Sequence, residues 1–272
     1  MLMQNKTPGC AACKSQQTLF PFSMAFQPIV DLLHGRIDAH EALVRGPANE
    51  GAGSVLRQVT PDVLYAFDQA CRTKAIELAA GLGLNTRLNI NFLPNAVYEP
   101  AACIRTTLLA SERTGFPPDR LTFEIVETED IADTEHLQRI IEVYRKQGFQ
   151  VALDDFGSGY SGLVRLATLR PDIVKLDRDL VRDCDTDPVR LGILASLVDM
   201  GERVGVKVVF EGVERAGELA ALRSIGARFV QGFLFARPVF EGLASDAEVA
   251  AGFTAAVVEG SGLETGLAAV GG

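Results

Sequence analysis

Two adjacent carboxylates, Asp154 and Asp155, follow a short apolar segment at residues 149–153. The apolar segment is typical of a buried strand, and the glycines and serines after the carboxylates allow backbone bends that bulkier residues resist. A strand that ends in acidic residues and opens into such a loop is a common way to build a metal or phosphate site. Alternatively, one aspartate caps the following helix and the other is exposed to solvent. The stretch alone is compatible with both interpretations.

Polar residues also end the other apolar segments that are typical of strands. They are Glu41, Asn91, Glu124, Asp154, Asp155, Lys175, Asp177, Glu211 and Gln231. Taken singly, an acidic residue at a strand end is more often a helix cap or a solvated group than a ligand. The acidic members of this set would repel one another at a common rim unless cations neutralised them, so their convergence would favour a metal site.

All of these candidate ligands are oxygen donors, whereas the three histidines and five cysteines form no ligand-like pattern at the same positions. Oxygen ligands favour Mg²⁺, Mn²⁺ or Ca²⁺ over zinc. More than four carboxylates exceed what one octahedral Mg²⁺ needs, which indicates two ions bridged by a carboxylate, the usual arrangement for hydrolysis of phosphate esters. Lys175 could stabilise the attacking water or the developing charge, or it could simply form an ion pair with Asp177.

The segments that position these residues alternate between strand and helix patterns. Strands are predicted at residues 24–30, 37–44, 88–91, 121–126, 151–153, 173–176, 206–210 and 228–230, and helices at 61–80, 101–114, 135–147, 188–204 and 214–224. This order favours a (β/α)8 barrel, in which catalytic residues lie at the carboxyl ends of strands, over a doubly wound sheet. The first two strands are separated only by a turn at residues 33–35. We therefore expect an α/β fold, a modified TIM barrel with one antiparallel strand.

The composition narrows the class of protein. Of 272 residues, 47% are hydrophobic and 22% are charged, as in soluble globular proteins. The net charge of −9 argues against a nucleic acid polymer as partner, although metal ions would allow a phosphate ligand. No uninterrupted apolar run is long enough for a membrane span, and residues 1–14 do not resemble a signal peptide. The odd number of cysteines is typical of a reducing compartment, so we expect a cytoplasmic protein.

The ends of the chain are expected to be less ordered than its middle. We predict a flexible segment at residues 1–18, one domain at 19–243, and a helix or tail at 244–272 that is loosely ordered at its end. Cys10 and Cys13 form a lone C-x-x-C pair, which lacks the other two ligands of a structural zinc site. A redox role for this pair remains a hypothesis.

Several separate motifs occur in a characteristic order along the chain. The motifs are Phe26-Gln27-Pro28-Ile29-Val30-Asp31, Glu41-Ala42-Leu43-Val44-Arg45, Asn91, Glu124-Ile125-Val126-Glu127, Asp154-Asp155-Phe156-Gly157, Lys175-Leu176-Asp177, Glu211-Gly212-Val213-Glu214 and Gln231-Gly232. In order and spacing they resemble the motifs of the EAL domain family of cyclic di-GMP phosphodiesterases, and the resemblance runs from about residue 22 to residue 238.

The resemblance implies hydrolysis of cyclic di-GMP to linear 5'-pGpG with two Mg²⁺ or Mn²⁺ ions, and a homodimer. Ca²⁺ is expected to inhibit, because its larger and looser coordination would not hold the two reacting oxygens at the required separation. The resemblance assigns Glu41, Asn91, Glu124 and Asp154 to one ion, and Asp154, Asp155 and Glu211 to the other. It assigns catalytic roles to Lys175, Glu211, Glu127 and Gln231, and substrate contacts to Gln27, Arg45, Asp177 and Glu214. Glu127 would tether the loop at residues 156–162, which couples metal binding to dimer contacts in this family.

A second function remains possible on the same resemblance. A receptor that binds cyclic di-GMP without hydrolysing it, and signals to a partner protein, could share the fold and most of the motifs. The loss of a predicted ligand or of Lys175 would favour such a receptor, and neither loss is present.

Overall fold

The computed structural model describes residues 20–94, 97, 99–126, 134–159 and 162–260. Glu127, Cys10, Cys13 and the predicted segment 1–18 lie outside these residues, as do positions 160 and 161 of the predicted loop and the end of the tail from 261. The strands of the described part are β1 Ser23–Asp31, β2 Arg36–Arg45, β3 Arg87–Asn91, β4 Leu121–Val126, β5 Gln150–Phe156, β6 Ile173–Leu176, β7 Lys207–Phe210, β8 Phe229–Val230 and β9 Val239–Phe240.

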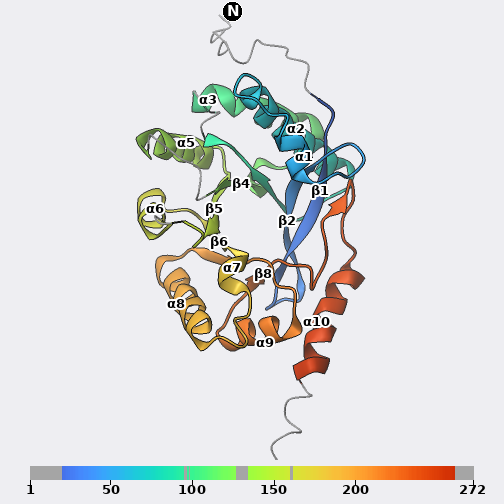
Figure 1. Ribbon diagram of the computed structural model, residues 1–272. Coiled ribbons are helices and arrows are strands. Elements are labelled where there is room, and N and C mark those ends of the chain that lie inside the picture. The colour runs from blue at the N-terminus through green and yellow to red at the C-terminus, as the bar shows by residue number, and fades with distance from the viewer. Residues whose placement is uncertain (1–19, 95–96, 98, 127–133, 160–161, 261–272) are drawn as a thin grey trace, which may run out of the picture.

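Strands β1 to β8 close into a barrel (Figure 1). Neighbours from β2 to β8 are parallel, whereas β1 lies antiparallel to both β2 and β8 and so closes the ring. Strand β9 is an addition that pairs with β1. The predicted fold, a modified TIM barrel with one antiparallel strand, is therefore confirmed, including the early hairpin.

Helices surround the strands (Figure 1). They are α1 Ala52–Leu56, α2 Leu64–Gly81, α3 Pro100–Cys103, α4 Arg105–Thr114, η3 Pro118–Arg120, α5 Thr134–Lys146, α6 Gly162–Leu169, α7 Arg178–Val181, α8 Pro188–Val204, α9 Ala216–Ser224 and α10 Asp246–Gly260. The predicted helix at 101–114 is two helices that meet at Ile104. The short helices α1, α6 and α7 were not predicted, because they are too brief to show a clear period. Within the described residues, none of the helices has the length and apolar character needed to span a bilayer.

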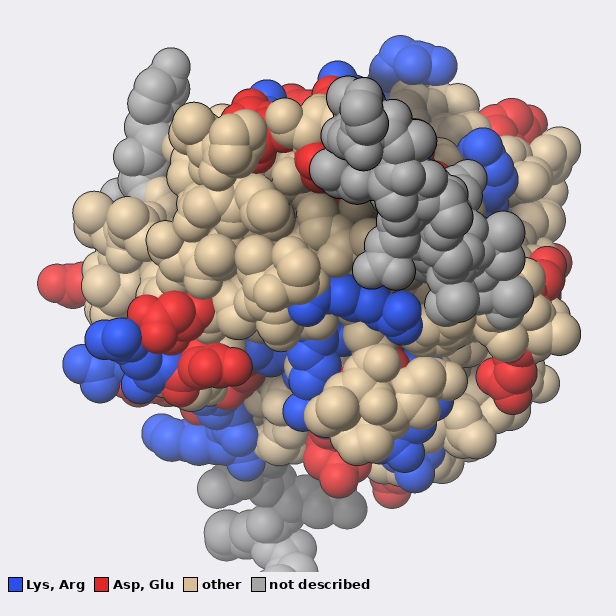
Figure 2. Space-filling model, turned by 90° about the horizontal axis from the view of Figure 1, so that it is seen from below, with Lys and Arg blue, Asp and Glu red and all other residues tan. Residues whose placement is uncertain are grey.

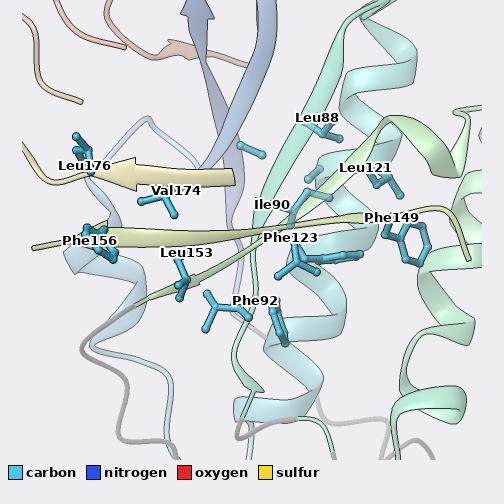
Figure 3. Close-up of a cluster of buried hydrophobic side chains, with 14 of the residues drawn as sticks. Leu88, Ile90, Phe92, Leu121, Phe123, Phe149, Leu153, Phe156, Val174 and Leu176 are labelled. Atoms are coloured by element: carbon cyan, nitrogen blue, oxygen red, sulfur yellow. The ribbon is translucent and has the colours of Figure 1, made fainter. Parts of the chain in front are cut away.

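Side chains on the outer face of the strands form the main hydrophobic core. Figure 3 shows members of this core on β3, β4, β5 and β6, including Phe123 and Leu153, packed beneath the helices. The Phe123 ring centroid lies 4.9 Å from that of Tyr144 on α5 and 5.2 Å from that of Phe149. These contacts fix the distance between the barrel wall and its helices, which holds the strand ends in place.

The inner face of the barrel has an apolar floor beneath its polar rim. The buried floor residues are Ile29, Ala39, Ala152, Ile173, Val209 and Phe229. Each lies two positions from a residue that the sequence analysis selected: Gln27, Glu41, Asp154, Lys175, Glu211 and Gln231. Since side chains of a strand alternate between faces with a period of two, each floor residue and its polar counterpart point into the same barrel.

Candidate active site

A buried lysine lies at the centre of the polar rim. Lys175 is 1% exposed, and its ammonium group contacts carboxylates from four different strands or strand ends. Its Nζ atom lies 3.2 Å from Glu41 Oε2, 3.0 Å from Glu124 Oε2, 2.9 Å from Asp154 Oδ1 and 2.7 Å from Glu211 Oε1. Asp177, the partner considered in the sequence analysis, is not among these contacts. The structure therefore places Lys175 in the acidic cluster rather than in a simple pair.

A bulge in β5 brings both adjacent aspartates toward this cluster. In a regular strand the side chains of Asp154 and Asp155 would point to opposite faces. The pairing of β5 with β6 shifts between Leu153 and Phe156, so that β5 contains one extra residue, and Asp155 has a positive φ of 53°. A bulge of this kind redirects a side chain at the rim of a barrel. Asp154 is buried rather than solvent-exposed, and Asp155 is half-buried beside it.

The carboxylates form two groups that could each hold a cation. Glu41, Glu124 and Asp154 offer oxygen atoms within 4.8 Å of one another, and so do Asp154, Asp155 and Glu211. Asp154 belongs to both groups. All of these donors are hard oxygen ligands, the type that Mg²⁺ and Mn²⁺ prefer. The donor chemistry therefore fits two divalent ions that share one carboxylate.

Side-chain amides orient the carboxylates of the cluster. Gln231 donates to Glu41 Oε2 at 2.8 Å and to Gln27 Oε1 at 3.3 Å, and Asn91 donates to Glu41 Oε1 at 3.1 Å. Asn89 donates to Glu124 Oε1 at 2.7 Å and was not predicted. Its signal in the sequence was its place two residues before Asn91, on the same face of β3. Hydrogen bonds of this kind fix the direction of carboxylates that bind metals.

One lysine does not neutralise this many buried carboxylates. Burial and the neighbouring carboxylates raise the pKa of Glu124 well above its usual value, and they also raise the pKa of Asp154. Burial, Asp154 and Glu41 raise the pKa of Glu211 to about 8, and burial, Asp154 and Asp177 raise that of Asp155 to about 6. The carboxylates of the cluster can therefore all be ionised together only when further positive charge, such as a bound cation, is present.

The pKa of Glu41, in contrast, is lowered. Burial acts to raise its pKa, but the pKa is lowered because Lys175 attracts the carboxylate and because Gln231, Lys175 and Asn91 donate hydrogen bonds to it. The pKa of Lys175 is raised well above its usual value, since the four carboxylates outweigh the effect of burial. The charged forms of both Glu41 and Lys175 are therefore favoured, and the two side chains form a charge-assisted pair within the cluster.

These pKa values predict that the metal-free protein loses stability as the pH rises from about 6.5 to about 8. The folded state holds a proton on Glu211 that the unfolded state has released, so this stability is lost as the pH rises through about 8. Burial lowers the pKa of His40 from 6.5 to about 4, so His40 changes the stability mainly below about pH 6.5, outside this window. Thermal unfolding in EDTA at the two pH values measures the effect, and saturating Mn²⁺ should reverse it. A metal-free protein that is equally stable at both would contradict the assignment.

A cavity of about 330 Å³ opens above the cluster. Its lining includes five residues predicted to meet the metals or water, Glu41, Asp154, Asp155, Lys175 and Glu211, and three predicted to meet substrate, Gln27, Asp177 and Glu214. A cavity of this size lies within the range of small-molecule sites. The predicted residues therefore border one common space.

Several of the predicted substrate contacts have other partners in the structure, and one cation beside them was not predicted. Arg178, which was not predicted, lines the cavity and forms an ion pair with Glu214 at 2.7 Å. Asp177 accepts a hydrogen bond from the Asp179 backbone at 2.7 Å and so caps α7. Arg45 is half-buried, donates to the Val44 carbonyl at 2.8 Å, and is not among the described residues that line this cavity. Arg178 could have been noticed as the only cation directly beside the Lys175-Leu176-Asp177 motif.

Known proteins share this arrangement of barrel and sequence. The family described as EAL domain matches residues 15–238 of the chain. A standalone versatile EAL protein from Vibrio cholerae O395, in its cyclic di-GMP-bound form, is 48% identical with a TM-score of 0.81, over 84% of this chain and 97% of that chain. BlrP1 of Klebsiella pneumoniae, in a complex with manganese and cyclic di-GMP, is 34% identical with a TM-score of 0.79, over 85% of this chain and 59% of that chain.

A curated relative adds an activity to the comparison. The cyclic di-GMP phosphodiesterase RocR of Pseudomonas aeruginosa is 34% identical over 179 residues, which are 65% of this chain and 44% of RocR. The chain spans about half or less of the length of the curated relatives that it matches. The likeness therefore concerns one part of those proteins.

Proposed function

The chain belongs to the EAL domain family, and from this premise we propose that it hydrolyses one phosphodiester bond of cyclic di-GMP to give linear 5'-pGpG. The observation that carries the proposal is the position of Lys175 among Glu41, Glu124, Asp154 and Glu211, with Asp154 common to two carboxylate groups. The cyclic di-GMP in the Vibrio cholerae and BlrP1 structures and the activity named for RocR support the choice of substrate.

We propose two Mg²⁺ or Mn²⁺ ions as cofactors. Glu41, Asn91, Glu124 and Asp154 would hold one ion, and Asp154, Asp155 and Glu211 would hold the other. When bound, such ions polarise the phosphate group and lower the pKa of a bound water. Burial and the neighbouring carboxylates, which together raise the pKa of Glu211 to about 8, disfavour the ionised cluster without cations and so support the presence of cations there.

The protein's own side chains would then position water and substrate. Lys175 has three N–H donors, which here face four carboxylates. Ions bound by those carboxylates would free a donor, and the ammonium group would then donate to the attacking water and stabilise developing charge. Gln231 and Gln27 are joined by a hydrogen bond at one side of the cavity, where they would orient a phosphate oxygen or a base. Arg45 offers a planar donor fork suited to phosphate. Glu127, a predicted tether of the loop, lies outside the described residues.

Product analysis tests the proposed activity directly. Purified protein is incubated with cyclic di-GMP and Mn²⁺, and chromatography measures the formation of pGpG, with EDTA as the matched control. We expect pGpG in Mn²⁺ and none in EDTA. Binding of cyclic di-GMP without product would instead support the receptor function.

Calcium is expected to inhibit this activity even though its oxygen ligands are present. Ca²⁺ is larger than Mg²⁺ and accepts six to eight ligands in a flexible arrangement, so it would hold the reacting oxygens less well. We expect the rate of pGpG formation in Mg²⁺ to fall at least about tenfold when Ca²⁺ replaces Mg²⁺. An equal rate in Ca²⁺ would show that the spacing of the two carboxylate groups does not select the ion.

We also propose that the chain forms a homodimer through the surface beside the β5–α6 loop. Leu163 and Val164 of α6 are 63% and 69% exposed, which is unusual for two adjacent large apolar side chains. Light scattering measures the mass of the protein in solution, and Leu163→Glu should shift a dimer toward monomer. A monomeric protein before the substitution would contradict the proposal.

A further inference from the structure

A second cavity lies at the other end of strands β2 and β3. It has a volume of about 620 Å³, compared with about 330 Å³ for the cavity above the acidic cluster. Its lining comes from the first half of β2, from residues 85–87 at the start of β3, from Arg120 of η3, and from residues 243–246, where α10 begins. His40 lines this cavity, whereas the adjacent Glu41 points into the barrel, because neighbouring side chains of β2 alternate between faces. The two cavities are therefore distinct.

Cationic side chains dominate the lining of this second cavity. It contains Arg36, Arg87 and Arg120, against two carboxylates, Asp38 and Asp246. Asp38 already forms an ion pair with Lys207 at 2.7 Å. The lining residues thus carry one more positive than negative group, in a chain whose net charge is −9, although Asp119 and Asp172 also attract the Arg87 guanidinium. Charge is unevenly spread elsewhere too, since basic side chains gather around the middle of the face in Figure 2.

Two buried groups in this lining lack hydrogen-bond partners among the described residues. One is the Arg87 guanidinium, through its Nε and Nη2 atoms, and the other is the His40 imidazole, through its Nε2 atom. His40 is only 3% exposed. His40 Nδ1 lies 2.9 Å from Thr86 Oγ1. The Thr86 hydroxyl has two acceptors in reach, His40 Nδ1 and, at 3.4 Å, the Arg87 carbonyl; when it donates to Nδ1, the shorter contact, Nε2 carries the ring proton and is a further donor. Buried donors without acceptors are rare in folded proteins because they cost stability, so an acceptor that enters the cavity beside these groups would stabilise the protein.

We propose that this cavity binds a phosphorylated small molecule of nucleotide size. Guanidinium groups match the oxygens of phosphate in a planar fork, and a neutral imidazole N–H adds a donor without repelling them. The lining also contains Ile37, Leu243 and Ala244, apolar surface that a phosphate alone would not use. A divalent cation is not suited to the cavity, because the arginines would repel it. The occupant is therefore an anion with an organic group.

Calorimetry on the full chain tests this proposal, with inorganic pyrophosphate and ATP as probes. Both are titrated in EDTA, because the metal-free acidic cluster disfavours anions, and the arginine variants described below assign the signal to this cavity. We expect both to bind, and ATP to bind more tightly because it also covers the apolar lining. The proposal is overturned if neither binds, and its organic part is overturned if ATP binds no better than pyrophosphate.

Substitutions separate a ligand site from a structural arginine. Arg87→Met should weaken ATP binding at least about tenfold and raise the melting temperature, because it removes buried donors that have no acceptor. A structural Arg87 would instead give unchanged affinity and a lower melting temperature.

Arg120→Met, at an exposed position, should also weaken ATP binding, and it tests the site if Arg87→Met folds poorly. Arg203→Met on α8 removes the same charge outside the cavity, at a side chain 76% exposed, and should leave the affinity unchanged. Equal losses in Arg203→Met and Arg120→Met would overturn the site.

Discussion

Replacing Asp154 with asparagine is expected to reduce the turnover of cyclic di-GMP in Mn²⁺ by roughly a thousandfold or more. Asp154 is the residue shared by the two carboxylate groups, so its loss would weaken both predicted ion sites at once. Asparagine has nearly the same shape, which keeps the packing of a side chain that is largely buried. The rate of pGpG formation by chromatography and the Mn²⁺ affinity by calorimetry measure the two effects.

Asp155→Asn is the matched control, because Asp155 follows Asp154 directly but belongs to one group alone. Its loss of activity should be smaller, and it should change the affinity of one ion. In EDTA, Asp154→Asn should melt at a higher temperature than the original protein, because the raised pKa of Asp154 means that its charge opposes folding there. Turnover that is unchanged in Asp154→Asn, or reduced equally in both variants, would contradict a shared ligand.

The sequence predicted the barrel because its strands and helices alternate, and it predicted most of the rim because polar residues end those strands. The period of two explains why this worked: Glu41, Lys175 and Glu211 each follow an apolar floor residue by two positions. The bulge at Asp155 was not predictable in this way. Adjacent residues of a regular strand cannot share a face, and only the shifted pairing of β5 with β6 brings both aspartates to one site.

Contacts across the barrel could not be predicted from the sequence either. Lys175 has Asp177 as a near neighbour in the chain, but its hydrogen bond to Glu41 spans 134 positions and that to Glu124 spans 51. Asp177 instead caps α7. Which carboxylate a buried lysine contacts depends on the closure of the ring, which nearness in the chain does not reveal. The same limitation concealed the hydrogen bond between Asn89 and Glu124.

Replacing Lys175 with methionine is expected to destabilise the metal-free protein by about 3–5 kcal/mol at about pH 8. The ammonium group is the positive charge shared by four carboxylates, and methionine fills a similar volume while leaving their repulsion unbalanced. Saturating Mn²⁺ should recover part of the loss, because ions bound only by the folded state stabilise it. Thermal unfolding in EDTA and in Mn²⁺ measures both effects.

The same variant should turn over cyclic di-GMP at least about a hundredfold more slowly in Mn²⁺, because no donor remains for the attacking water. Lys207→Met is the matched control: Lys207 forms an ion pair with one carboxylate, Asp38, and is 22% exposed, so its removal should cost about 1 kcal/mol or less. A Lys175→Met protein as stable in EDTA as the original would mean that proton uptake by the carboxylates fully balances the loss of the ammonium charge. Normal turnover in that variant would mean that Lys175 serves the fold alone, and that the water is positioned by other residues.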